Sequence, residues 1–171
     1  MNKDLDKTLV QLFPSLYRDY GGDMRKTCMA WGFSCGDGWY PILLALSIEL
    51  TGIEKEYNIQ VVADQVKEKF GGLRFYYHTE GSFKWYQRRW QWLCTFMCSH
   101  GFAKLYWKFI AFRKKLWRNP GEKVSDAVES AEAESYKTCE VCSNPGKPTR
   151  DGWITTLCER CKKESDDRRN N

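Results

Sequence analysis

Four cysteines near the C-terminus constrain this chain more than any other feature. They form two tight pairs, Cys139-x2-Cys142 and Cys158-x2-Cys161, with fifteen residues between the pairs. Two thiolates at this spacing occupy one edge of a tetrahedron, and two such pairs close a four-thiolate site with no position for a catalytic water. Metal binding supplies the folding free energy of modules this small, on the order of 10 kcal/mol. We therefore predict a zinc ribbon with one structural Zn²⁺.

The remaining segments predict an α+β protein. Leu5, Leu9 and Leu12 recur at helical spacing within residues 4–16, and Asp37 is the expected N-cap of a second helix. Asn119 and Pro120 form the start signal of a later helix. The expected parts are a helical and β-hairpin core (1–81), a basic aromatic αα-hairpin insertion (82–119), a connecting helix (120–136), the zinc ribbon (137–162) and a disordered tail (163–171).

Two β-rich stretches flank Gly71-Gly72, and two glycines between strands predict a two-residue hairpin turn. This register pairs Phe70 with Leu73 and Glu68 with Phe75 on a face that we expect to be buried, with Tyr77 beyond them. The opposite face is a basic and aromatic strip suited to binding phosphates and stacking a base. An ordinary solvated sheet face is the alternative. The candidate ligand-binding residues are Lys67, Lys69, Arg74, Tyr76 and His78, together with Trp39.

The net charge of +5 belongs to one segment. Residues 81–118 contain nine Lys or Arg, no Asp or Glu, and 12 of the 26 aromatic residues, whereas the rest of the chain has 18 basic and 22 acidic residues, a net of −4. A localised basic surface attracts polyanions or anionic membranes. No transmembrane segment is predicted, because charged residues interrupt the apolar stretch 90–112. We assign non-specific attraction to Lys104, Lys108, Lys114 and Lys115.

Other reactive residues give weaker signals. Cys28, Cys35, Cys94 and Cys98 leave a second metal site open, although cysteine is commonly a small buried residue. Glu68 is a general base or the partner of a nearby cation. The sequence contains two histidines and no phosphate-loop glycine pattern, so it suggests no catalytic set. We therefore expect a non-enzymatic protein.

Several strings together resemble a family of small proteins of tailed bacteriophages and prophages. The resemblance covers residues 33–161, with residues 82–119 as a variable insertion. It implies a phage origin, a location in the host cytoplasm and the zinc ribbon, and it supplies no catalytic residues. The strings are Gly36-Asp37-Gly38-Trp39-Tyr40, the run from Val66 to Tyr76, Ala131-Glu132-Ala133-Glu134-Ser135, Cys139-Glu140-Val141-Cys142, and the run from Gly152 to Cys161.

These patterns favour a binding protein for a phosphate-bearing ligand. The ligand is a nucleic acid, or a nucleotide signal of host defence that the protein sequesters. A polymer predicts graded, salt-sensitive binding, whereas sequestration predicts a discrete pocket at the interface of a homo-oligomer. Two alternatives stay open: a protein-interaction module that inhibits or redirects a host protein, and association of the insertion with a membrane surface. The charged segment 1–7 lacks the apolar region of a signal peptide, which also predicts a cytoplasmic protein.

Overall fold

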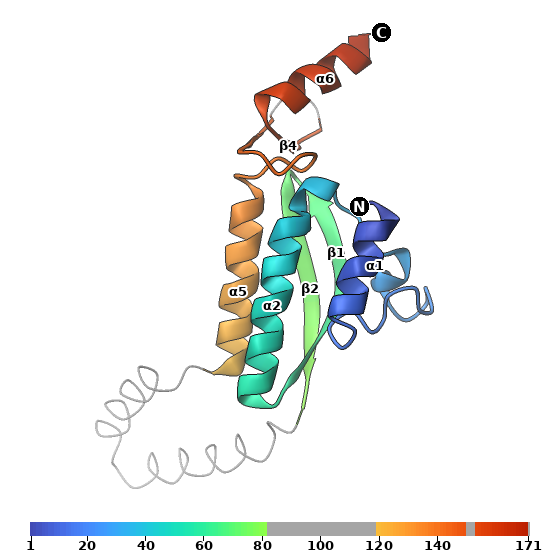
Figure 1. Ribbon diagram of the computed structural model, residues 1–171, viewed down its shortest axis with the longest axis vertical. Helices are drawn as coiled ribbons and strands as arrows, with labels where there is room; N and C mark the ends of the chain where they lie inside the picture. The colour runs from blue at the N-terminus through green and yellow to red at the C-terminus, as the bar shows by residue number, and fades with distance from the viewer. Residues whose placement is uncertain (82–118, 150–152, 171) are drawn as a thin grey trace, which may run out of the picture.

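A long antiparallel hairpin forms the axis of the core, and helices lie along it (Figure 1). The computed structural model describes residues 1–81, 119–149 and 153–170. Helices and antiparallel strands are combined in it, so the predicted α+β class is confirmed. Residues 82–118 of the predicted insertion lie outside the described residues, and with them Lys104, Lys108, Lys114, Lys115, Cys94 and Cys98.

The N-terminal helix α1 (Lys3–Leu12) begins where the Asn2 side chain accepts a hydrogen bond from the Asp4 amide. It ends at Leu12, in agreement with the expectation that Pro14 ends the helix, because the position before a proline is disfavoured in a helix. The 3₁₀ helix η1 (Cys28–Trp31) follows within a long loop.

Helix α2 (Tyr40–Tyr57) begins after the 3₁₀ turn η2 (Asp37–Trp39), so the prediction that Asp37 caps it is wrong. The Asp37 carboxylate instead accepts a hydrogen bond from the Asn2 amide at 2.6 Å. The helix passes through Gly52 and ends at Asn58, whose left-handed backbone (φ 51°) is a common helix terminator.

Strands β1 (Gln60–Lys69) and β2 (Gly72–Glu80) form the hairpin, but the turn differs from the predicted one. Its central residues are Phe70 (φ 54°) and Gly71 (φ 76°) rather than Gly71 and Gly72. Positive φ at both positions is the signature of a type I′ turn. Gly72 is required for another reason: a Cβ there would lie 2.3 Å from Cζ of Tyr136.

The true register pairs Val66 with Phe75 and Glu68 with Leu73. It differs from the predicted register by two residues, so the two faces keep their composition. Leu73 and Phe75 are buried as expected, whereas Phe70 is 64% exposed and its predicted burial is wrong. The register shifts again at Asp64, which forms a β-bulge.

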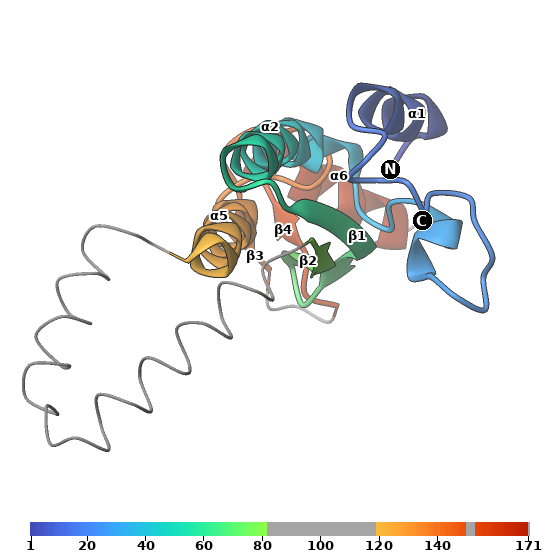
Figure 2. The same ribbon diagram turned by 90° about the horizontal axis from the view of Figure 1, so that it is seen from below.

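The buried face of the hairpin packs against α2 and α5 (Pro120–Ser135), which lie side by side along it (Figures 1 and 2). The side chain of Asn119 accepts a hydrogen bond from the Gly121 amide, and Pro120 begins α5, as the start signal predicts. Leu43, Leu50 and Val124 are fully buried in the resulting core.

Both edges of the hairpin are covered in the half near the turn. Beside β1, the Ser34 amide donates to the Val66 carbonyl at 2.9 Å, and the Ser34 carbonyl accepts from the Glu68 amide at 2.8 Å. Beside β2, two strand amides donate to side chains of α5, namely Ser135 Oγ at 2.8 Å and Glu132 Oε1 at 3.0 Å. An open edge would recruit strands of other chains, so α5 does for β2 what a third strand would do.

The C-terminal module sits at the turn end of the hairpin (Figure 1). It consists of β3 (Lys147–Pro148), β4 (Thr156–Leu157) and α6 (Glu159–Asn170). The predicted disordered tail is instead helical through Asn170. Glu164 supports this helix, because its carboxylate lies 3.8 Å from Arg160 Nε and its carbonyl accepts from Arg168 Nε at 3.0 Å.

Within the described ranges, no helix combines the length and apolarity that crossing a bilayer requires.

Candidate metal centre

The four cysteine sulfurs converge as their spacing predicts, and all lie within 4.8 Å of one another. Cys142 Sγ is 3.6 Å from Cys158 Sγ and 3.5 Å from Cys161 Sγ. Sulfurs around a tetrahedral Zn²⁺ stand about 3.8 Å apart when each Zn–S bond is about 2.3 Å, whereas a disulfide needs about 2.05 Å. The cluster therefore has the dimensions of a four-thiolate metal site.

A tight turn positions the first pair of cysteines. The Cys139 amide donates to the Asn144 carbonyl at 2.7 Å, and the Ser143 amide donates to the Cys139 carbonyl at 3.0 Å. Ser143 has a left-handed backbone (φ 63°), which reverses the chain directly after Cys142. The Asn144 side chain then donates to Cys142 Sγ at 3.3 Å, so the turn also orients the sulfur.

The second pair lies at the start of α6. Cys158 immediately precedes the helix, and its sulfur accepts from the Cys161 amide at 3.5 Å while its carbonyl accepts from the Lys162 amide at 2.9 Å. The unpaired amides and positive dipole end of a helix stabilise a thiolate at this position.

The local charges differ across the cluster. A hydrogen bond from the backbone amide of Asn144 lowers the pKa of Cys142 to about 6, whereas burial raises the pKa of Cys161 to about 12. The Arg160 guanidinium faces the sulfurs of both, and hydrogen bonds to them raise its own pKa. A metal ion must displace the proton of Cys161, so binding to this cluster should tighten as the pH rises.

The loop between Cys35 and α2 holds the first cysteine turn on the core. The Gly38 amide donates to the Glu140 carbonyl at 2.7 Å, and the Gly38 carbonyl accepts from Ser143 Oγ at 2.8 Å. A Cβ on Gly38 would lie 2.2 Å from the Cys139 carbonyl oxygen. Trp39 is fully buried beside this joint, where its indole Nε1 donates to the Thr138 carbonyl at 2.8 Å.

The hairpin turn forms the second contact with the ribbon. Thr156 is fully buried, and its hydroxyl donates to the Gly71 carbonyl at 2.5 Å. Ile154 lies against the same glycine: a Cβ added to Gly71 would stand 3.0 Å from Ile154 Cγ2. The glycine-rich strings of the sequence thus meet at one joint between the hairpin, α5 and the ribbon, and the structure places candidate Trp39 in that joint rather than on the surface.

Arg74 is held by the core. Its Nη1 donates to the Leu73 carbonyl at 2.8 Å and to Glu132 Oε2 at 3.2 Å, and its Nη2 donates to the Tyr136 hydroxyl at 2.7 Å. The side chain is only 27% exposed. The structure thus gives its guanidinium three protein acceptors at the point where the sequence suggested a phosphate.

Lys67, Lys69 and Tyr76 lie together on the opposite face from the core. Lys67 Nζ is 5.4 Å from the centroid of the Tyr76 ring, and Lys69 Nζ is 5.3 Å from the centroid of the Phe70 ring. Tyr76 is 44% exposed. We call the strip formed by Lys67, Lys69, Phe70 and Tyr76 the turn strip.

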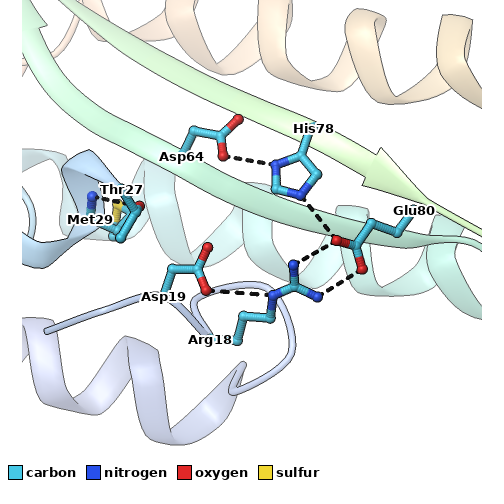
Figure 3. A network of polar contacts seen from close by, with 7 residues as sticks. All are labelled: Arg18, Asp19, Thr27, Met29, Asp64, His78 and Glu80. Carbon is cyan, nitrogen blue, oxygen red and sulfur yellow. Dashed lines mark hydrogen bonds and ion pairs between the residues drawn. The ribbon is translucent and has the colours of Figure 1, made fainter. Parts of the chain in front are cut away.

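His78 belongs to a different, acidic environment at the far end of the same face (Figure 3). Its Nδ1 is 2.7 Å from Asp64 Oδ1 and its Nε2 is 3.3 Å from Glu80 Oε1. Arg18 in turn donates to both oxygens of Glu80, at 2.8 and 2.6 Å. The hydrogen bond with Asp64, followed by that with Glu80, raises the pKa of His78.

The remaining reactive residues lie apart from these groups. Glu68 accepts from the Gly71 amide at 2.7 Å and so closes the turn. Cys35 is buried, which raises its pKa to about 12, whereas Cys28 is exposed on η1. Among the described residues, the four ribbon cysteines are the one group of potential metal ligands that cluster.

Comparison with known proteins gives no family model, no curated protein and no solved structure that matches this chain.

Proposed function

We propose that the four cysteines hold one structural Zn²⁺, and that the protein is a phage-encoded nucleic-acid-binding protein that uses the turn strip. The sulfur spacing and the four-thiolate donor set support zinc, because such closed tetrahedral shells are typical of structural zinc sites. The ion keeps the ribbon folded against the turn between β1 and β2. The ribbon thereby fixes the position of this turn and of the turn strip beside it.

The turn strip is the observation that carries the proposal. Within the described residues, neither Lys67 nor Lys69 has a carboxylate partner, and each ammonium lies over an aromatic ring. Unpaired lysines interleaved with exposed aromatic rings suit a phosphate backbone whose bases stack alongside. Arg74 lies opposite Lys67 in the neighbouring strand, where Glu132 and Tyr136 hold its guanidinium in place.

A polymer fits this surface better than a sequestered nucleotide. The turn strip is an open sheet face rather than an enclosed pocket. A pocket of about 480 Å³ does lie between α2 and α5, but Glu49, Glu56 and Asp126 contribute to its lining. Its one lysine, Lys123, already bonds both oxygens of Glu56 at 3.0 Å. Three carboxylates there would repel a nucleotide phosphate.

Fluorescence anisotropy with a labelled oligonucleotide tests the proposal. The double variant Lys67→Ala/Lys69→Ala should bind more weakly, and the absolute value of the slope of log K against log salt should fall by about 1.4 on a single strand, because two phosphate contacts of about 0.7 each are lost. The matched control is Lys3→Ala/Lys7→Ala, which removes two exposed lysines from α1 and should leave the slope unchanged.

Two results would overturn the proposal. In one, the wild type binds neither nucleic acid nor nucleotides at low salt, while a host protein co-purifies in a stoichiometric complex. The interaction-module alternative would then take its place. In the other, the two double variants lose affinity equally, which would mean that binding follows net charge rather than the turn strip.

A further inference from the structure

Phe70 occupies a position that the fold would fill better with another residue. It is the first central residue of a type I′ turn, where Asn, Asp and Gly are preferred because φ is positive. A bulky side chain there is an uncommon and strained choice. Its ring is 64% exposed, so burial in the core does not offset this strain. An exposed aromatic ring on a strained turn points to a role in binding.

The ribbon brings a second exposed ring to the same end of the hairpin. Trp153 is 73% exposed and directly precedes Ile154, which lies against Gly71 in the turn. Thr156 anchors this segment through its bond to the Gly71 carbonyl. The aromatic surface at the turn therefore has contributions from two modules, and the metal-bound ribbon supplies one of them.

The charged residues differ along the exposed face of the hairpin. Lys67 and Lys69 stand near the turn, whereas Asp64 lies midway along β1 and Glu80 ends β2 at the opposite end of the hairpin. Both carboxylates are more than 40% exposed, at 44% and 45%. Toward His78, however, Arg18 pairs with Glu80 and the imidazole pairs with Asp64. A polyanion therefore meets lysines without carboxylate partners at the turn and a mixture of paired charges toward His78, so its favourable path leads onto the ribbon.

We propose that the partner is single-stranded nucleic acid, which crosses the hairpin turn onto the ribbon with bases stacked on Phe70 and Trp153. This inference rests on the proposed function and specifies the partner of the same site. The flat faces of duplex bases are already stacked on one another, so exposed rings gain most from an unpaired strand. Lys67 and Lys69 lie where they can meet the phosphates between those bases.

The deciding variant is Phe70→Asn, because it separates folding from binding. Asn is preferred at this turn position, so the variant should melt at the same temperature as the wild type or higher. Its affinity for a single-stranded oligothymidylate should nevertheless fall about tenfold, as expected for one lost stacking contact. The salt slope should stay unchanged, since no charge is removed.

Trp153→Ala should weaken binding to a similar extent, again by about tenfold. Its control is Trp31→Ala, which removes an equally exposed ring (71%) from η1 and should leave the affinity within about twofold of the wild type. The wild type should also prefer the single strand to a duplex of the same length by about tenfold or more.

The outcomes separate this inference from the proposed function. Equal affinity for duplex and single strand, or full affinity in both Phe70→Asn and Trp153→Ala, would overturn the single-strand inference. If Lys67→Ala/Lys69→Ala still lowered the salt slope in that case, the proposed function would stand. Absence of binding to either nucleic acid at low salt would overturn both.

Discussion

The two ends of the β1–β2 hairpin are held by opposite kinds of contact. At the turn end, the ribbon packs closely on the core: the Gly38 amide donates to the Glu140 carbonyl, and the buried Thr156 hydroxyl donates to the Gly71 carbonyl. A Cβ on Gly38 would collide with the Cys139 carbonyl, and one on Gly72 with the Tyr136 ring. At the open end, Arg18, Glu80 and His78 are joined by ion pairs that are at least a third exposed. Buried backbone contacts are strong and intolerant of change, whereas exposed ion pairs contribute little. Stability should therefore depend on the metal at one end and weakly on pH at the other.

Loss of the metal ligands should produce the largest effect. Cys158→Ser, or chelation of the wild type, should unfold the ribbon, because metal binding supplies on the order of 10 kcal/mol of its folding free energy. Limited proteolysis should then cut within residues 137–170, and metal analysis should give one zinc per wild-type chain. Cys28→Ser, at an exposed cysteine outside the cluster, should change neither result.

A ribbon that resists proteolysis without metal would break the comparison between the two ends. It would mean that the contacts with Gly38 and Gly71 are sufficient to fold the module, and that the cysteine cluster has another role.

A methyl group at the joint should produce the next largest effect. Gly38→Ala places a Cβ 2.2 Å from the Cys139 carbonyl oxygen. Moving the chain to relieve this clash would break the hydrogen bond that the amide of residue 38 donates to the Glu140 carbonyl. We expect the free energy of unfolding to fall by about 1–3 kcal/mol. Urea denaturation measures this change.

Gly52→Ala is the matched control. It lies within α2, and nothing approaches its Cβ position within 4 Å. The same substitution there should raise the free energy of unfolding by about 0.5–1 kcal/mol, because alanine favours a helix. If both variants lost stability equally, the joint would be no tighter than an ordinary surface.

Arg74→Ala tests whether this residue belongs to the core or to the ligand. The variant leaves Glu132 and Tyr136, which its guanidinium contacts at 3.2 and 2.7 Å, without their partner. We expect a loss of about 1–2 kcal/mol in the free energy of unfolding, together with a modest change in oligonucleotide affinity. Unchanged stability with abolished binding would return Arg74 to the phosphate contact that the sequence suggested.

The cysteine cluster was predictable because its signal is local. The chemistry of thiolate pairs at this spacing demands a common centre, whatever the rest of the chain does. The faces of the hairpin were predictable for a similar reason, since alternation with a period of two survives a register error of two residues. Both inferences depend on residue type and spacing alone.

The turn and the role of Arg74 depended on tertiary contacts that no local pattern encodes. Gly72 is small because Tyr136 packs against it rather than because it belongs to the turn, so position 70 takes the turn conformation that the glycine pair suggested for Gly71 and Gly72. Glu132 of α5, which pairs with Arg74, also accepts a hydrogen bond from the Phe75 amide of β2. Phe70 was expected to be buried because an apolar residue that continues the buried face of a strand normally lies in the core.

The smallest predicted effect concerns the open end, where His78 should make stability depend on pH. The bond with Asp64 raises the pKa of His78 above 6.5, so the folded state favours the imidazolium. This contribution is complete below about pH 6.5 and is lost as the pH rises through the raised value. Arg18, the main cause, lowers the pKa of Glu80 from 4.5 to about 2, so its contribution is complete above 4.5 and is lost as the pH falls toward 2.

The melting temperatures of the wild type and His78→Gln should therefore differ most near pH 5.5 and least near about pH 8.5. Because these side chains are exposed, the difference should not exceed about 2 °C. Asp64→Asn removes the largest cause of the shift and should flatten the pH dependence. An equal loss in His78→Gln at both pH values would mean that the ring acts through packing, and the contrast between a metal-dependent end and a pH-dependent end would fail.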